Sequence, residues 1–480
     1  KFKRYPTLVL SDYNLYKLKK KKNILPPKCC SVRCNLAAMM FFGFAVVYGL
    51  RVNLSVAMVA MVNGTNDQSS SNGNISIECP IPRYSWDSKT QGMLLGAFFF
   101  GYLFTQIPGG YLSGRFGGSL FLGGGVLGTA VLTLLTPLSA QLGAKWLFAL
   151  RALEGFGEGV TLPAMMAMWA RWAPPLERAR LMTFSGAGSS FGAFVALPLT
   201  GFICRSLGWP AVFYSCGAGC LWAVFWFILV SDEPRTHPRI SDREKHYIIN
   251  SIGSQGMPHG WSVPVLSMLF SVPVWAIIIP QMCGNWSYYT LLTSLPTYMD
   301  TVLHFDLQQN SFLSALPYLS DWLFSVGSGV LADNLLEREL LSVTAVRKIF
   351  TFIGLFLPAV FLLAVGFTGC SGVLAVTFLT FSSALEGFSA AGVYINQIDI
   401  APRYAGTLLG ITNTFGMISG VLAPIVVGYL TRDVITGWRH VFWLSAGVSA
   451  FGAIFYVIFG TGKIQSWART DEESDTDIHN

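Results

Sequence analysis

Twelve mostly apolar segments of about 20 residues dominate this chain and restrict what it can fold into. A helix of about that length crosses the roughly 30 Å hydrocarbon layer of a membrane. Only 12% of the residues are charged, whereas a soluble domain usually has about 25%. The segments begin near Asn35, Thr90, Leu120, Ala144, Leu181, Ala211, Pro273, Phe312, Ile349, Ser371, Ala405 and Val441. We therefore predict an all-α membrane protein with twelve transmembrane helices.

The positions of lysine and arginine predict how the chain is oriented. With the N-terminus in the cytosol, the expected cytosolic segments hold 24 of these residues and the opposite loops hold six, which is the bias that sets topology in membranes. Residues 1–34 hold ten of them, so the net charge of +7 belongs to this tail and not to a folded face that would bind nucleic acid. We expect both termini in the cytosol and the lipid bilayer as the partner of the basic tail.

Domain boundaries follow from the spans. We expect a basic cytosolic tail, a first six-helix bundle, a cytosolic linker, a second six-helix bundle and an acidic cytosolic tail, at residues 1–34, 35–231, 232–272, 273–462 and 463–480. In the linker, Ser241 precedes a helical run that has Glu244 at its third position. This arrangement is a capping box, and it predicts an amphipathic helix on the membrane surface.

The first loop on the far side of the membrane, residues 63–89, is expected to be luminal and glycosylated. It contains two N-glycosylation acceptor tripeptides, at Asn63 and Asn74. Cys79 in this loop and Cys370 in another expected luminal loop lie where thiols can oxidise. A disulfide between them is one hypothesis, and two free thiols are the alternative.

The two halves of the chain resemble each other at a nearly constant spacing. The sequence Ala-Leu-Glu-Gly-Phe occurs at 152–156 and again at 384–388, which is 232 residues later. Gly208-Trp209 likewise recurs as Gly437-Trp438. The repeat predicts two pseudo-symmetric bundles with a substrate site near the midplane between them.

Charged residues inside spans cost about 2.5–3.5 kcal/mol or more each, and they therefore point to function. Arg51 lies midway along the first span, with no acidic residue within four positions of it on that helix. A guanidinium binds a carboxylate through two parallel hydrogen bonds. We expect Arg51 to anchor the carboxylate of a substrate. The alternative is a structural ion pair with an acid on another helix.

Three charged residues share one face of the fourth helix: Arg151, Glu154 and Glu158 are spaced i, i+3 and i+7. Gly155 and Gly159 form a small-residue pair that lets a neighbouring helix approach closely. Burial favours the neutral form of a carboxyl group, and an adjacent guanidinium favours the charged form. Because Glu154 is nearer Arg151, we expect Glu158 to carry the proton between an acidic lumen and a neutral cytosol. The alternative is a static Arg–Glu network.

Other residues of the spans are candidates for supporting roles. We expect Tyr48, Phe99 and Tyr102 to form an aromatic wall for a sugar ring, with ordinary span packing as the alternative. For the intramembrane acids Asp321 and Glu386 we expect a role in packing or gating rather than in substrate binding.

The same features separate three classes of membrane protein. A channel needs pore-lining rings from symmetric repeats, but the charges lie asymmetrically in the first half. An enzyme needs a nucleophile–base pair or a metal cluster, and no such spacing occurs within the spans. We therefore expect a secondary transporter for a small organic anion, with no enzyme activity, no cofactor and no metal.

Two sets of motifs resemble a known family. The segment Gly110–Arg115 after the second span has a weaker counterpart in Gly329–Asn334 after the eighth, a pattern that resembles the major facilitator superfamily. Five further segments resemble the organic-anion branch of that superfamily, which includes the vesicular glutamate transporters and, most similar, the lysosomal sialic acid exporters. They are Tyr48–Val56, Gly101–Gly110, Arg151–Gly159, Trp172–Arg178 and Gly410–Thr414.

The resemblance implies roles for particular residues. It supports Arg51 as a substrate-binding residue and the two glutamates that share a helix face with Arg151 as proton-coupling residues. It implies a gating role for Asp333 and Arg115. Met166 stands where the family often has histidine, so the carboxylates are expected to carry more of the proton coupling.

The resemblance also bears on specificity. The vesicular glutamate transporters have arginine where this chain has Asn285, and histidine where it has Leu95. A neutral Asn285 with Tyr288 and Tyr289 beside it suits a polyhydroxylated monocarboxylate, whose hydroxyl groups need hydrogen-bond partners rather than charge.

The implied function is proton-coupled export of sialic acid and related acidic sugars, including glucuronate, from the lysosome by alternating access. Two alternatives stay open: voltage-driven vesicular uptake of aspartate or glutamate, and sodium/phosphate or urate transport. The implied location is the lysosomal membrane, with synaptic-type vesicles or the plasma membrane as alternatives and sorting adaptors as further partners.

Overall fold

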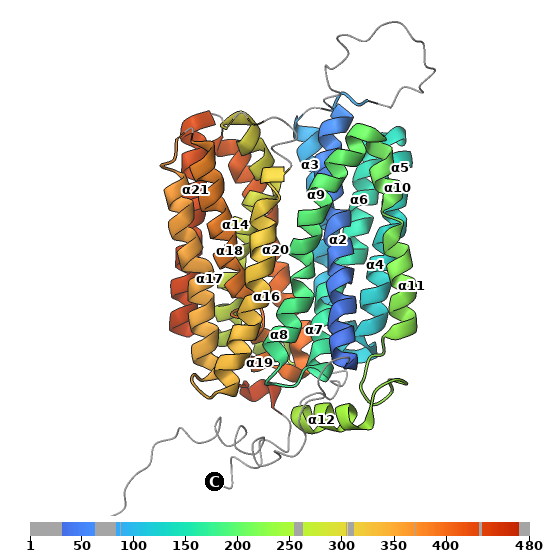
Figure 1. Cartoon of the computed structure of the whole chain (residues 1–480), viewed down its shortest axis with the longest axis vertical. Helices are drawn as coiled ribbons and strands as arrows, with labels where there is room; N and C mark the ends of the chain where they lie inside the picture. The colour runs from blue at the N-terminus through green and yellow to red at the C-terminus, as the bar shows by residue number, and fades with distance from the viewer. Residues whose placement is uncertain are drawn as a thin grey trace, which may run out of the picture.

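The computed structural model describes residues 31–62, 83–86, 88–253, 263–303, 305, 312–369, 371–431 and 434–469. Within these ranges the chain forms two helical bundles that stand side by side (Figure 1). The first bundle consists of α2 (Val32–Val62), α3 (Ser88–Phe116), α4 (Gly118–Leu134), α5 (Thr136–Leu142), α6 (Ala144–Glu158), α7 (Thr161–Trp172), α8 (Arg178–Gly186), α9 (Gly188–Ser206), α10 (Trp209–Ser215) and α11 (Ala218–Leu229).

The second bundle follows a linker that carries two short helices, α12 (Asp242–Ile252) and α13 (Val265–Leu269). The bundle consists of α14 (Val272–Thr301), α16 (Leu316–Glu337), α17 (Val343–Val365), α18 (Gly372–Glu386), η2 (Gly387–Ala390), α19 (Asn396–Ile400), η3 (Pro402–Tyr404), α20 (Ala405–Leu430) and α21 (Val434–Phe459). A 3-10 turn, η4 (Ser466–Ala468), ends the described chain. In Figure 1, α12 lies across the lower end of the first bundle, outside both bundles.

Each of the twelve predicted segments coincides with a helix or with two helices separated by a short break. In the described part of the chain, eight helices are long and apolar enough to cross a membrane, or nine if α4 and α5, which meet at a bend of 47°, form one span. The remaining three predicted spans are α6 with α7, α14 and α16. These three contain most of the polar residues singled out from the sequence, which is why they are less apolar.

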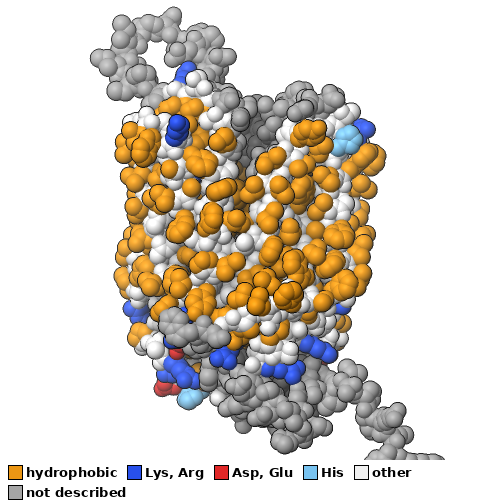
Figure 2. Space-filling view, turned by 180° about the vertical axis from the view of Figure 1, so that it is seen from behind, with side chains coloured by type: hydrophobic (Ala, Val, Ile, Leu, Met, Phe, Trp, Pro, Cys, Tyr) orange, Lys and Arg blue, Asp and Glu red, His pale blue; other side chains and the backbone are white. Residues whose placement is uncertain are grey.

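The outer surface is apolar where a soluble protein would be polar. Figure 2 shows hydrophobic side chains over the whole height of the bundles, with lysine and arginine gathered toward the two ends. Among the outward-facing residues, Phe202 is 70% exposed and Val373 is 79% exposed. Such a belt is stable against lipid tails and not against water.

The bundles touch from mid-height to the end near α12. α3 packs against α20, and α8 and α9 pack against α16. A large apolar cluster at the α12 end contains residues of α7 and α8 together with residues of α16 and α17. The polar contacts between bundles that are described below lie in the same half of the molecule.

The predicted helix of the linker is present as α12, but its capping box is only half formed. The Ser241 hydroxyl accepts from the backbone N–H of Glu244 at 3.3 Å, as predicted. The Glu244 carboxylate does not return to Ser241 and instead accepts from the backbone N–H groups of Val32 (3.1 Å) and Arg33 (3.2 Å). The first N–H groups of α2 have no partners within that helix and attract a carboxylate, so α12 is fixed to the start of the first span.

Candidate functional site

Arg51 is the centre of the charged group in the first bundle. Its guanidinium forms an ion pair with Glu158 of α6, in which both Nε (3.0 Å) and Nη2 donate to Oε1 of Glu158. Three aromatic rings surround the guanidinium, with ring centroids 4.4 Å (Tyr48), 4.9 Å (Phe98) and 5.1 Å (Tyr102) from its central carbon. Arg51 is only 8% exposed, so the pair lies in a low-dielectric, aromatic environment where electrostatic interactions are strong.

This pairing corrects one premise of the sequence analysis. The spacing on α6 predicts that Glu158 is farther from Arg151 than Glu154 is, and an ion pair of Arg51 with an acid on another helix is the alternative to substrate binding. The structure brings Arg51 from α2 into direct contact with Glu158. The other carboxylate oxygen of Glu158, Oε2, is buried and has no hydrogen-bond partner among the described residues. Glu158 is therefore held by one cation on one of its two oxygens.

Arg151 and Glu154 form the second ion pair, with 2.5 Å between Nη1 and Oε2, as their i, i+3 spacing predicts. The hydroxyl of Thr136 also donates to Glu154, at 3.3 Å. Arg151 Nη2 donates to the backbone carbonyl of Arg51 at 3.3 Å. The two arginines and two glutamates are thus connected, and their formal charges cancel.

Close helix packing explains how α3 comes to share this site. A Cβ atom on Gly155 would collide with the carbonyl of Phe98, and one on Gly159 would lie 2.6 Å from the carbonyl oxygen of Tyr102. The predicted small-residue pair of α6 is therefore confirmed as a contact, and its neighbour is α3. Because α3 lies so near, the rings of Phe98 and Tyr102 reach the guanidinium of Arg51.

The candidate residues of the second bundle divide into two groups. Tyr289 faces the first bundle: its ring lies 5.1 Å from that of Phe99, and it interacts electrostatically with Arg51. Asn285 accepts a hydrogen bond from the Tyr394 hydroxyl at 3.2 Å, while its Nδ2 has no hydrogen-bond partner among the described residues. Tyr288 lies farther along, at a separate small cavity described below.

A chain of buried amide side chains was missed by the sequence analysis. Gln106 of α3 donates to the carbonyl of Gly159, directly after Glu158, and accepts from Asn413 of α20 at 2.7 Å. Asn413 accepts in turn from Gln281 at 3.3 Å. All three amide side chains are at most 4% exposed. These amides link the Glu158 end of α6 to the second bundle. The sequence signal that could have revealed them is the presence of three uncharged amide side chains in otherwise apolar segments.

Asp333, expected to act in gating, lies between the bundles. Its carboxylate accepts from the backbone N–H groups of Ala179 (3.1 Å) and Arg180 (2.7 Å) at the start of α8. Nearby, Asp399 pairs with Arg347 (2.6 Å) of its own bundle and with Arg178 (3.3 Å) of the first. These bonds place Asp333 at a contact between the bundles, and its part in gating stays a prediction.

Arg115, the other predicted gating residue, lies half-buried in the last turn of α3. In the turn beside it, the carbonyl of Gly114 accepts from Arg171 at 2.7 Å. Met166 is buried in the apolar cluster at the α12 end. The two predicted glycosylation sites, Asn63 and Asn74, and the two cysteines of the disulfide hypothesis, Cys79 and Cys370, lie outside the described residues.

Near α12, Arg33 connects the linker to the loop before α8. It pairs with Glu177 at 2.9 Å and lies 4.9 Å from the ring of Tyr247. Burial raises the pKa of Tyr247 to about 12, so this ring stays neutral at physiological pH. Within the described ranges, no three His, Cys, Asp or Glu side chains are grouped so that they could hold a metal ion.

Comparison with known proteins relates these features to a family. The profile of the family described as Major Facilitator Superfamily matches residues 40–424. The chain is 51% identical to sialin of Homo sapiens, over 93% of this chain and 92% of sialin. It is 40% identical to vesicular glutamate transporter 2 of Homo sapiens, over 92% of this chain and 76% of that protein. It is also 38% identical to a probable small intestine urate exporter of Homo sapiens, over 96% of each.

One solved structure has a similar fold. The proton:xylose symporter XylE bound to 6-bromo-6-deoxy-D-glucose superposes with a TM-score of 0.66 at 16% identity, covering 90% of this chain and 97% of that one. The two-bundle, all-helical fold predicted from the spans and the repeat is confirmed, and the chain is a multi-pass membrane protein.

Proposed function

Because the chain belongs to the major facilitator superfamily, in the group of its members that includes sialin, we propose that it is a proton-coupled secondary transporter of acidic sugars. Its substrate is an organic anion of the sialic acid type, with glucuronate as a related cargo, and alternating access carries it out of the lysosome. The observation that carries this proposal is the buried Arg51–Glu158 ion pair inside its ring of aromatic side chains.

In this mechanism a proton and a substrate carboxylate exchange at Arg51. Glu158 occupies the guanidinium donors that a substrate carboxylate needs. When luminal acid protonates Glu158, the negative charge that holds Arg51 is lost, and the guanidinium binds the substrate instead. When the proton leaves to the neutral cytosol, Glu158 recovers Arg51 and displaces the substrate. Proton and anion therefore move in the same direction.

The number of cations that can bind a substrate favours a substrate with one carboxylate. Arg151 is already paired with Glu154 and bound to the backbone of α2, so Arg51 is the cation that exchanges partners. The rings of Tyr48 and Tyr102 lie against its guanidinium, where they form an aromatic wall beside a bound sugar. The unpartnered Nδ2 of Asn285 offers a donor to a sugar hydroxyl. A polyhydroxylated monocarboxylate uses all of these groups.

The two bundles are joined at the α12 end, as expected for a transporter in the state that binds its substrate from the lumen. We assign the α12 end to the cytosol, where Asp333 and the Arg178–Asp399 pair join the bundles. Release into the cytosol requires these contacts to break while the opposite ends of the bundles approach. Both chain termini then lie in the cytosol, where adaptors that sort the protein to lysosomes reach them. Asn63 and Asn74 lie in the lumen, where they are glycosylated.

Transport into proteoliposomes of the purified full chain tests this function. Sialic acid, glucuronate, glutamate and urate are each supplied under an imposed pH gradient or an imposed voltage. We expect saturable uptake of sialic acid that follows the pH gradient and is inhibited by glucuronate. Accumulation of glutamate that follows voltage alone would contradict the proposal, as would sodium-dependent phosphate uptake or chemical conversion of the solute.

A further inference from the structure

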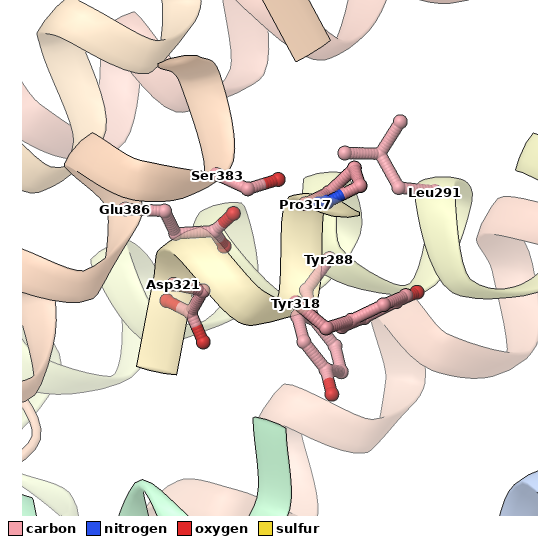
Figure 3. Close-up of a pocket in the computed structure, with 7 residues that line it drawn as sticks. All are labelled: Tyr288, Leu291, Pro317, Tyr318, Asp321, Ser383 and Glu386. Atoms are coloured by element: carbon pink, nitrogen blue, oxygen red, sulfur yellow. The ribbon is translucent and has the colours of Figure 1, made fainter. Parts of the chain in front are cut away.

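A second pair of acids lies in the second bundle, apart from Arg51. Asp321 of α16 and Glu386, the last residue of α18, line one small cavity (Figure 3). The cavity has room for about one water molecule. Its other lining residues are Tyr288, Leu291, Pro317, Tyr318 and Ser383.

The internal repeat explains why these two acids meet. Glu386 occupies the same place in its copy of the repeat as Glu154 does in the first, 232 residues earlier. Gly387 follows it, and a Cβ atom there would lie 2.9 Å from the carbonyl oxygen of Asp321. The small residue thus lets α16 approach the end of α18, just as Gly155 lets α3 approach α6.

The second copy has lost the cation that the first copy has. At the same spacing, Ser383 replaces Arg151 and Ala390 replaces Glu158. Within the described residues, no lysine, arginine or histidine forms an ion pair with Asp321 or Glu386.

The groups that do interact with the pair carry no charge at neutral pH. They are the phenols of Tyr288 on α14, Tyr318 on α16 and Tyr394 after η2. From the first bundle, α9 contributes the hydroxyl of Ser190. In the described part of the chain, no charged side chain of α17 interacts with Asp321 or Glu386.

Ser383 differs from the other hydroxyl side chains of α18 that lie near the cavity. Thr377 and Thr380, earlier on α18, donate to carbonyls one turn back at 2.7 and 2.8 Å. Ser383 is buried, at 7% exposure, and makes no such bond, whereas Glu386 is half-buried and forms no ion pair or hydrogen bond within the described residues. Figure 3 shows the Ser383 hydroxyl and the Glu386 carboxyl group directed to the same side of α18, toward Pro317. Buried polar groups of this kind normally find a partner.

Asp321 also connects the two bundles. Its carboxylate accepts a hydrogen bond from the hydroxyl of Ser190 on α9. The contact between α9 and α16 is one of the contacts that hold the bundles together at mid-height. The charge on Asp321 therefore affects a surface that must separate during alternating access.

We propose that Asp321 and Glu386 form a second proton-binding site, in which the two carboxyl groups and the small cavity between them hold one proton. Two ionised carboxylates at one intramembrane cavity, without a cation, repel each other and are poorly solvated. One shared proton leaves a single negative charge, which the hydroxyl groups of Ser190 and Ser383 stabilise. Loss of this proton leaves two ionised carboxylates without a cation, and separation of α9 from α16 lets water solvate them. The site deepens the proposed function, because it makes bundle separation a second step that responds to protons.

Infrared spectroscopy of the purified full chain at neutral pH tests proton occupancy directly. We expect wild type to show the C=O stretch of a protonated carboxylic acid. The double variant D321N/E386Q, which keeps both shapes without charge, is expected to lose this band, whereas E158Q keeps it. A band that is absent from wild type, or unchanged in D321N/E386Q, overturns the proposal. The measurement does not require transport, so a carrier that fails the uptake test for sialic acid can still show the band.

The effect on the bundles is tested with spin labels on the outer faces of α9 and α16. We expect the distance between labels in wild type to increase as pH rises, and the distance in D321N/E386Q to stay short at every pH. A distance that is independent of pH in wild type contradicts the second part of the proposal. Stabilisation of wild type by sodium chloride but not by potassium chloride, absent in D321N/E386Q, would show that the site holds a sodium ion and overturn the proton assignment.

Discussion

The charged group of the first bundle and its counterpart in the second share a motif but differ in charge. Both contain Glu-Gly-Phe, within the last turns of α6 in the first bundle and at the end of α18 in the second, with the glycine packed against a neighbouring helix: Gly155 against α3 and Gly387 against α16. In the first bundle, two arginines balance two glutamates. In the second, Asp321 and Glu386 share a cavity without an ion-pair partner among the described residues.

The comparison teaches that packing and chemistry in such repeats are set by different residues. The glycine is kept because a Cβ atom would separate the helices, whichever charges lie beside it. The residue three positions before the glutamate, Arg151 or Ser383, determines which ion the site attracts. We propose accordingly that the site with a cation binds an organic anion and that the site of acids alone binds a proton.

The largest expected effect comes from removing the cation from the first site. Arg51→Gln leaves Glu158 buried without a partner and removes the anchor for the substrate carboxylate. Loss of one partner of a buried, hydrogen-bonded charge pair costs binding about 2–5 kcal/mol, so we expect exchange of sialic acid at equal pH to fall by at least about 30-fold. Arg51→Lys is the matched control, because it keeps the positive charge without the planar guanidinium. Its exchange rate should lie between the rates of wild type and R51Q. Exchange by R51Q at the wild-type rate would contradict the proposed role.

The two glutamates of the first site should separate coupling from binding. Glu158→Gln resembles the protonated state permanently, so we expect it to abolish accumulation driven by a pH gradient and to spare exchange at equal pH. Glu154→Gln leaves the Arg51–Glu158 pair intact and should reduce the pH-driven rate far less than Glu158→Gln does. Both rates are measured in the same proteoliposomes. If E158Q accumulates sialic acid down a pH gradient as wild type does, Glu158 does not couple the proton.

An arginine introduced at Asn285 should give the second bundle a cation that can bind a carboxylate, as Arg51 does in the first. Asn285→Arg places a guanidinium where the side chain now receives the Tyr394 hydroxyl. We expect sialic acid uptake to fall and binding of a dicarboxylate to improve, by about 10-fold for one new charge-assisted pair. Asn285→Gln, which adds length without charge, is the control. Competition by glutamate against labelled sialic acid reports the change, and equal competition in N285R and N285Q would show that charge at this position does not set specificity.

The smallest effect is expected at the α12 end, where Asp333 of the second bundle accepts hydrogen bonds from the backbone at the start of α8 in the first. Asp333→Asn weakens the bond to the start of α8 by about 1 kcal/mol, a shift of roughly 5-fold toward the opened end. Asp232→Asn is the control, because Asp232, at the start of the linker, accepts from the backbone N–H of Ser119 at 2.7 Å and so caps α4 of the first bundle. Labelling of cysteines introduced between α8 and α16 measures opening. Equal labelling in D333N and D232N would show that Asp333 does not hold the end closed.

The features that were predictable from the sequence are those set by neighbours along the chain. The spans, the repeat and the Arg151–Glu154 pair all follow from local composition or from spacing on one helix. The Arg51–Glu158 pair joins residues that are 107 positions apart, and nothing local to Arg51 shows which acid it meets. The same reason explains Glu244, whose local spacing predicts a capping box but whose carboxylate binds α2. It also explains the amides of Gln106 and Asn413, which meet only across the bundles.

The most direct test of the central claim follows protons and sialic acid together in proteoliposomes of the wild-type chain, with the membrane voltage clamped at zero. The exchange at Arg51 predicts that sialic acid applied at equal pH carries protons with it, so that the acceptor side acidifies in fixed proportion to the anion moved. It also predicts that E158Q exchanges sialic acid without this acidification. Net sialic acid flux without proton movement in wild type, or flux that stops when the voltage is clamped, would contradict the account.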